Sequence, residues 1–424
     1  MGAETWRRWA WGLLLAAILL YSLVHFAYSG IYAALRVEGA DFRSIFPGKL
    51  MFGAVERWPR LAKEWIIITS YIPSTVIWNY GPVPHFLTLP FVFVSTKAQA
   101  LTIILGINLV FTFISACLWT RMVGGDRLRP LLIGGIACVW LNYFPLLEAL
   151  AGREIEVLEL FLITVAMWAL RRQRQTLAGV GIGVAAMTKF LPAIFIPYLL
   201  IKRFHRAFWV AVITTLLLGG LGQWLLGFEH SVTLSLLREE TGGQIHQVSA
   251  PHQALASVLY KMFTHFDPQQ RHPVILYHEI LRPLGMILQA ALLLVCGGFL
   301  WRWRQSRLLE LETALLAIVM VLAAPHANTY YLVFVLPALS VGVASWVQQP
   351  QAFTPVLKAA FIGAIVLSGL LVPMQVLGWM TGLSGDTVAQ VIQLYSLPAV
   401  GMMLAAITMV GLHQSVRQVH GCAS

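Results

Sequence analysis

The chain has 424 residues, of which 58% are hydrophobic and only 11% are charged, and its mean hydropathy is +0.75. An average soluble domain carries roughly 25% charged residues, because polar groups must cover its core. This composition argues against a soluble enzyme, a disordered protein and a nucleic-acid module. Long Leu, Ile, Val and Ala runs can cross about 30 Å of hydrocarbon, whereas a β-barrel would show short alternating strands. The sequence therefore predicts an all-α, polytopic transmembrane helical bundle.

The chain carries 29 Lys and Arg residues against 18 Asp and Glu residues, a net charge of +11. Basic cytoplasmic loops are the first explanation of this excess, and an anionic lipid or phosphate partner is the second. No CxxC pair is present among the four cysteines, so we expect neither a disulfide nor a cysteine metal site. Arg7 and Arg8 precede an apolar run of about 25 residues, too long for a signal-peptide core, which predicts a retained first helix.

Apolar runs give the expected helices in chain order. The first covers about 10–34, and a polar, basic segment follows at about 36–64. The later runs lie at about 65–79, 83–96, 98–120, 131–147, 153–170, 175–188, 190–201, 207–228, 274–300, 311–324, 328–346, 356–373 and 388–412. Several are short and broken by Gly or Pro, which lipid tolerates only where the backbone is buried in protein or lines a cavity.

Basic clusters predict the side of the membrane on which each loop lies. Those placed in the cytoplasm are Arg7/Arg8, Arg121/Arg127/Arg129, Arg171/Arg172/Arg174, Lys202/Arg203/Arg206 and Arg302/Arg304/Arg307. The two longest polar segments, about 36–64 and 229–273, then lie outside, although the first of them is itself basic. The count is 12 or 14 helices, with 12 favoured, in a single integral-membrane domain over 1–424.

Asp41 and Arg43, in GADFRSIF, follow the first expected helix. A carboxylate at the membrane surface can act as a general base on a hydroxyl, and the alternative is an ordinary capping residue. Tyr80 and Pro82, in WNYGPVPHF, either shape a cavity wall or mark a proline-punctuated helix start. Lys189, in MTKFLP, lies at an expected external turn. Such an ammonium must pair, for example with the phosphate of a lipid-linked substrate, or snorkel to ordinary headgroups.

The external segment 229–273 contains His252 and Gln253 just before an amphipathic stretch. Its Gly242–Gly243 pair favours a mobile, substrate-covering loop, and the absence of HExxH argues against zinc. A second break, APHANTYY, places His326 and Asn328 at an external junction ahead of Tyr330. Histidine there can bind a phosphate or relay a proton, and the alternative is an aromatic belt at the headgroups.

The order of these features resembles that of GT-C-type glycosyltransferases, most closely glycosyltransferase family 87, the polyprenol-phosphate-mannose-dependent mannosyltransferase group. The resemblance runs over most of the chain. His252 stands where the family commonly has Asn, and the second junction lacks the usual Trp. The residues that carry the resemblance are Asp41, Tyr80 and Pro82, Lys189 and Pro192 with the basic cluster after them, His252 to Leu255, and Pro325, His326, Tyr330 and Tyr331.

The resemblance implies a plasma- or inner-membrane enzyme that acts on the external or periplasmic side with inversion. It would move a sugar, expected to be mannose, from a polyprenyl phosphate to a hydroxyl of a lipid or glycan acceptor. Asp41 would be the catalytic base. Lys189, His326 and Arg43 would stabilise the leaving phosphate, because fixed cationic and hydrogen-bonding groups act strongly in a dry cavity. The substrate pocket would be lined by Tyr80, His252, Gln253, Asn328 and Tyr330.

No metal, cofactor or nucleic acid is expected. The main alternative function is a polytopic transporter or flippase of a lipid-linked or anionic substrate, which broken helices and a lysine between them also suit. No internal repeat is visible to support that alternative. A ligase with another lipid-linked donor and a structural assembly subunit are the remaining alternatives.

Overall fold

The structure is a computed structural model of the chain. It describes residues 3–32, 35, 81–88, 97–125, 129–152, 154–226, 252–265, 274–275, 278–306, 308–325, 327–369, 393 and 395–421. These residues form α1 (Ala3–Phe26), the π-helical turn η1 (Ala27–Tyr32), α6 (Pro82–Thr88), α7 (Lys97–Gly124), α8 (Pro130–Asn142), α9 (Phe144–Gly152), α10 (Glu156–Arg171), α11 (Gln175–Lys189), the 3-10 helix η3 (Leu191–Ile194), α12 (Phe195–Ile201) and α13 (His205–Leu226). They continue with α15 (Leu255–Met262), β1 (Thr264–His265), β2 (Val274–Ile275), α16 (His278–Arg302), α17 (Leu309–Leu322), the 3-10 helices η4 (Thr329–Val335) and η5 (Pro350–Ala352), α18 (Leu336–Gln348), α19 (Pro355–Gly369) and α22 (Leu397–Gly421).

The expected helical membrane architecture is confirmed. Within the described ranges, six helices are long and apolar enough to cross a membrane, and the bent pair α8–α9 makes up to seven. The β structure there is one antiparallel pair, in which Thr264 faces Ile275. Several helices of the bundle, such as α11 with 15 residues, are shorter than a full crossing. The expected total of about 12 helices therefore stays a prediction.

One expected helix is divided in two. The run at about 131–147 becomes α8 and α9, which meet at a bend of 52° and extend to Gly152, beyond the expected end of the run. Pro145 has no N–H and cannot continue the backbone ladder of α8. The hydroxyl of Tyr143, at the bend, donates to the Leu332 carbonyl at 3.0 Å and so ties the bend to η4.

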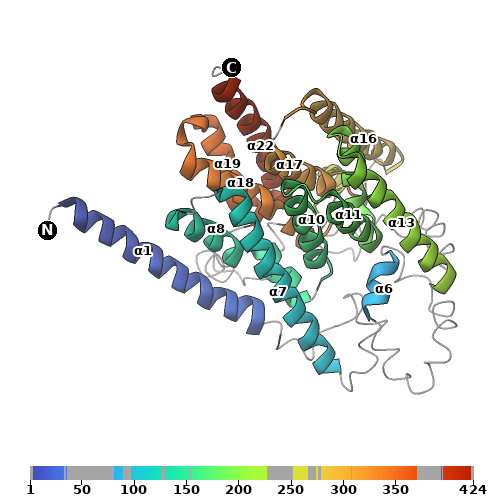
Figure 1. The fold of residues 1–424 in the computed structure, drawn as a ribbon, viewed down its shortest axis with the longest axis horizontal. Coiled ribbons are helices and arrows are strands. Elements are labelled where there is room, and N and C mark those ends of the chain that lie inside the picture. Colours follow the sequence, from blue (N-terminus) through green and yellow to red (C-terminus); the bar gives the residue numbers. More distant parts are fainter. Residues whose placement is uncertain are drawn as a thin grey trace.

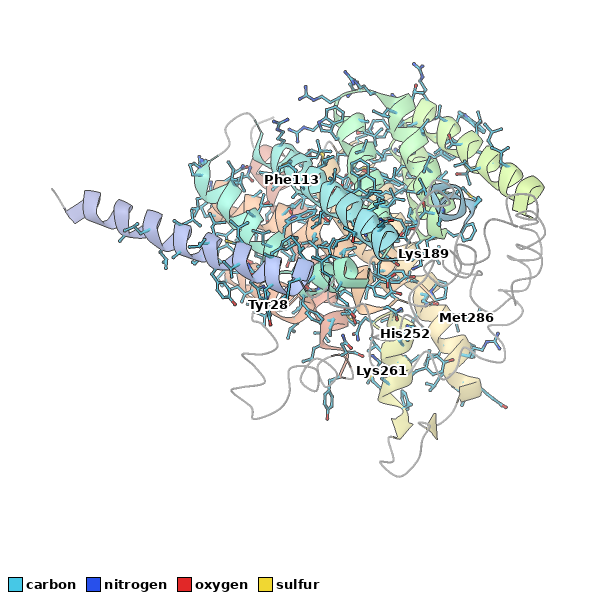
Figure 2. All side chains as sticks on the ribbon, turned by 90° about the horizontal axis from the view of Figure 1, so that it is seen from below. Tyr28, Phe113, Lys189, His252, Lys261 and Met286 are labelled. Carbon is cyan, nitrogen blue, oxygen red and sulfur yellow. The ribbon has the colours of Figure 1, made fainter. Side chains whose placement is uncertain are left out.

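Burial separates a central layer of helices from a peripheral one. In the span Thr329–Gln348, which joins η4 and α18, 72% of the window is buried, against 6% in the span of α1 and 17% in those of α13 and α16. The residues of α17 from Leu311 to Leu322 are all buried, so this helix is enclosed on every side. The exposed apolar side chains of the outer helices, such as Tyr28, Phe113 and Met286 (labelled in Figure 2), suit contact with lipid.

Helices α10, α11 and α13 lie side by side (Figure 1), and α11 is pressed closely against α13. A Cβ added to Gly183 of α11 would lie 2.6 Å from the Cβ of Thr214, and one on Gly179 would lie 2.5 Å from the Ala207 carbonyl oxygen. Small residues at these positions let the two helices approach, as is common in membrane bundles. This packing fixes the position of α11 relative to α13.

Polar residues gather at the two ends of the helical bundle. These ends are named the Lys189 end and the Lys202 end after a lysine in each. The Lys189 end comprises the start of α6, α10, α15 and η4 and the end of α11. The Lys202 end comprises the end of α7, α10, α12, α16 and α18 and the start of α17, and Gln348 there donates to the Val123 carbonyl at 3.3 Å. The clusters at Arg121, Arg171, Lys202 and Arg302 thus share one end, as the sequence predicted. The side of the membrane that this end faces stays a prediction.

Candidate functional site

Lys189 is the last residue of α11, and the sequence after it stops the helix. Phe190 adopts the left-handed conformation with φ 63°, and η3 then begins at Leu191 with Pro192 in its first turn. Lys189 is thus a basic residue in the last turn of α11, where the helix dipole favours a cation. The expected break between two apolar halves is therefore real, and it places Lys189 at a fixed point.

Lys189 is buried in the protein rather than extended toward headgroups. Its side chain is only 4% exposed, and its ammonium forms an ion pair with Oε1 of Glu156, the first residue of α10. The ammonium also lies 4.2 Å from the ring centroid of Tyr331 and 5.6 Å from that of Tyr330. Ion pairing and aromatic faces compensate a cation that has lost its water. The site thus presents a desolvated charge between a carboxylate and two aromatic rings.

Three further glutamates, Glu148, Glu154 and Glu159, surround this ion pair. Burial raises the pKa of Glu154 well above its ordinary value of 4.5, and the charges of Glu156 and Glu148 raise it further while Lys189 opposes them. Glu159 is completely buried, and neither of its carboxylate oxygens has a hydrogen-bond partner within the described part of the chain. Oε2 of Glu156 and Oε2 of Glu148 are also without a partner among these residues. Such buried acceptors call for a proton, a water or a ligand hydroxyl.

His252 and Gln253 are held at the same end of the bundle. The Gln253 amide donates to the Ala327 carbonyl at 2.6 Å, and its side chain donates to the Gln393 carbonyl at 2.9 Å. Lys261, from the end of α15, donates to the carbonyls of His252 at 2.5 Å and Gln393 at 3.0 Å. Burial lowers the pKa of Lys261 to about 7. Figure 2 labels Lys189, His252 and Lys261, which come from α11, the residues before α15, and α15.

The segment that follows Tyr80 contacts the end of α11 directly. The Gly81 amide donates to the Thr188 carbonyl at 2.8 Å. A Cβ on Gly81 would lie 1.9 Å from the Met187 carbonyl oxygen, so only glycine permits this approach. Two motifs that are about 100 residues apart in the sequence are therefore neighbours, as the prediction of one shared site requires.

The structure brings together five of the predicted site residues and leaves four outside its described part. Asn328 donates to the Tyr330 hydroxyl at 2.6 Å, and Tyr330 in turn faces Lys189. The five at the Lys189 end are Lys189, His252, Gln253, Asn328 and Tyr330. Asp41, Arg43, Tyr80 and His326 lie outside the described residues. Among the described residues, no group of three or more His, Cys, Asp or Glu is arranged to hold a metal ion.

Sequence reasoning missed Glu156 and the two glutamates that flank it in the sequence, Glu154 and Glu159. It also missed Lys261. A signal for the glutamates was present, because GREIEVLELF places Glu154, Glu156 and Glu159 in an otherwise apolar run. Ionisable residues within membrane helices are rare and mark functional sites by default. Lys261 gave a weaker signal, since a lysine at the end of an amphipathic stretch is ordinarily at the surface.

The fold and this end together define a polytopic helical membrane protein with a buried, charged site at one end of its bundle. Comparison with protein families supplies the chemistry. The family described as glycosyltransferase family 87 matches residues 78–325, more than half of the chain, and the chain belongs to this family. It is accordingly a membrane glycosyltransferase, as the resemblance predicted. No curated protein matches it.

Proposed function

We propose that the protein transfers a sugar, with mannose as the first candidate, from a polyprenyl phosphate to a hydroxyl of a lipid or glycan acceptor. The observation that carries the proposal is the buried Lys189 site within the family match. A lipid-phosphate donor leaves its phosphate at the membrane surface, and a desolvated ammonium stabilises the charge that develops on it. The transporter alternative has no comparable support.

The proposed reaction is a single inverting displacement. Asp41 removes the proton of the acceptor hydroxyl, the hydroxyl oxygen bonds to the anomeric carbon, and the bond from that carbon to the phosphate oxygen breaks. The polyprenyl phosphate leaves with the electron pair. General-base catalysis of this kind contributes about 10²–10⁴ in rate.

Lys189 is proposed at the donor phosphate, with Arg43 and His326 as further groups there. The ammonium of Lys189 already contacts Glu156 and Tyr331, so a bound phosphate must either share the ammonium with these two residues or displace them. Tyr80, His252, Gln253, Asn328 and Tyr330 are proposed to line the substrate pocket. The carboxyl groups beside Lys189 suit sugar hydroxyls, which donate the hydrogen bonds that these oxygens lack. The active site is proposed on the external or periplasmic side.

The test is transfer of label from radiolabelled polyprenyl-phosphate mannose to a membrane lipid extract by purified protein in nanodiscs. Asp41→Asn should lower turnover at least about 100-fold while the protein stays folded and binds donor. Glu38→Gln, a carboxyl change three residues earlier in the same segment, is the matched control and should keep turnover. Absence of transfer from any polyprenyl-phosphate sugar by folded protein would refute the proposal. Full turnover by Asp41→Asn would remove Asp41 as the base.

A further inference from the structure

A cavity lies at the Lys202 end, at the far end of α10 from Glu156. Its volume is 810 Å³, and its walls come from the ends of α7, α10 and α18 and from the residues between α16 and α17. Sites for small molecules typically have about 300–1,000 Å³. The cavity is therefore large enough for a ligand, and none of the proposed glycosyltransferase residues lines it.

The lining of this cavity is basic. Among its described lining residues the cations are Arg171, Lys202 and Arg304, and the carboxylate is that of Glu310. Arg171 pairs with Glu310, and Lys202 is bound to oxygens of the protein. Arg304 has no carboxylate partner in the described part of the chain, and its guanidinium lies 5.0 Å from the ring centroid of Trp301. The lining thus has an excess of positive charge and one arginine that is not neutralised.

The lining also contains uncharged hydrogen-bond donors. Gln305 is an exposed lining residue, and Ser345 and Gln349, at the end of α18, line the cavity as well. Guanidinium, amide and hydroxyl groups together are the donors that bind phosphate oxygens. These groups are suited to a phosphate group with more than one oxygen available.

The inner wall of the cavity is apolar. It is formed by buried side chains that include Leu170, Leu311 and Val341. A free phosphate gains nothing from such a wall, whereas an amphiphile buries its chain there while its headgroup meets the donors. Basic pockets between membrane helices are known to hold anionic lipid headgroups in this way.

We propose that this cavity is a binding site for an anionic glycerophospholipid, with the phosphate at Arg304 and Gln305 and the start of an acyl chain along the apolar wall. The occupant is a lipid of the bilayer rather than a substrate of the transfer reaction. The proposal does not depend on the proposed function, because the site lies at the opposite end of the bundle from Lys189.

Native mass spectrometry of the purified chain in neutral detergent tests the site. The probes are dioleoyl phosphatidylglycerol, dioleoyl phosphatidylcholine and inorganic phosphate. We expect phosphatidylglycerol to bind roughly tenfold more tightly than phosphatidylcholine, and Arg304→Gln to weaken it roughly tenfold by loss of a charged hydrogen bond. Arg172→Gln is the matched control, since Arg172 is an exposed arginine of the same end that does not line the cavity, and it should bind as the wild type does.

Gln305→Glu provides a second variant at an exposed position, where a new carboxylate should repel the headgroup without a change in folding. Equal binding of the two lipids would overturn the proposal. Equal losses in Arg304→Gln and Arg172→Gln would also overturn it, because binding would then follow the general charge of this end. Competition by inorganic phosphate as effective as that by phosphatidylglycerol would assign the cavity to a free anion instead.

Discussion

Two buried lysine–glutamate pairs lie at opposite ends of the bundle, and they use their hydrogen-bonding capacity very differently. In both, the lysine side chain is 4% exposed and the glutamate is completely buried. At the Lys202 end the ammonium donates to the carbonyls of Trp303 and Ser306 and to Glu312. Glu312 also accepts from the Tyr198 hydroxyl at 3.0 Å and lies 3.5 Å from Nε2 of His413. This network ties α12, α16, α17 and α22 together.

At the Lys189 end, unlike at Glu312, carboxylate oxygens are left without a hydrogen-bond donor among the described residues. Oε2 of Glu156 and both oxygens of Glu159 lack partners among the described residues, and the neighbouring rings offer only their faces and hydroxyl groups. Unsatisfied buried polar groups are costly, so they are kept where something other than stability requires them. The comparison teaches that a buried ion pair is not itself a sign of function, whereas a pair surrounded by unused acceptors is.

The largest expected effect is at the Lys202 pair. Lys202→Met leaves the carboxylate of Glu312 buried without its cation, and removal of one partner of such a pair costs about 3–5 kcal/mol. Thermal unfolding in detergent should show this loss. Arg203→Gln, the exposed neighbour, is the control and should unfold within about 0.5 kcal/mol of the wild type. Similar stability of Lys202→Met and the control would contradict a structural role for this pair.

Double variants sharpen the comparison. Lys189→Met with Glu156→Gln removes both charges, and we expect its stability to return to within about 1 kcal/mol of the wild type. Lys202→Met with Glu312→Gln should stay about 2 kcal/mol or more below it, because the Trp303 and Ser306 carbonyls lose their donor. Unfolding of the four single and two double variants measures both couplings. Equal recovery of stability in the two double variants would contradict the difference between the two ion pairs.

Gly81→Ala tests the contact between Gly81, just before α6, and the end of α11. The new Cβ would meet the Met187 carbonyl at 1.9 Å, and the displaced segment should cost about 1–3 kcal/mol and lower turnover as well. Gly220→Ala is the control, since nothing lies within 4 Å of the Cβ there. The measurement compares the turnover and the unfolding temperature of the two variants with those of the wild type. Wild-type turnover and unfolding temperature in Gly81→Ala would show that neither activity nor stability depends on the close contact of Gly81 with α11.

The smallest expected effect is a change in the pH dependence of stability when Glu154 is replaced. Because its pKa is raised in the folded protein, the folded state holds this proton more tightly than the unfolded state does. The resulting stability is complete below the ordinary value of 4.5 and is lost as pH rises through the raised pKa. Glu154→Gln should remove this loss and flatten the unfolding temperature against pH. Parallel curves for the wild type and the variant would contradict burial of a protonated Glu154.

The sequence predicted most of the helices because their signal is local. The run at 175–188 became α11, and the break at Lys189 and Pro192 was found as the end of that helix. It did not predict the bend between α8 and α9 at Tyr143, although Pro145 lies there, since apolar residues continue on both sides of the proline. The pairing of Lys189 with Glu156 was also missed, because a contact across 33 residues depends on how helices pack and not on local spacing.

The measurement that tests the distinction most directly is the affinity of polyprenyl phosphate for the Lys189→Met/Glu156→Gln variant, in competition with labelled donor. We predict that the variant is folded but binds at least about tenfold more weakly than the wild type, because a charge-assisted contact to the phosphate is gone. Arg172→Gln, at the other end, should bind as the wild type does. Equal affinity of the folded double variant and the wild type would contradict the claim that the Lys189 end receives the donor phosphate.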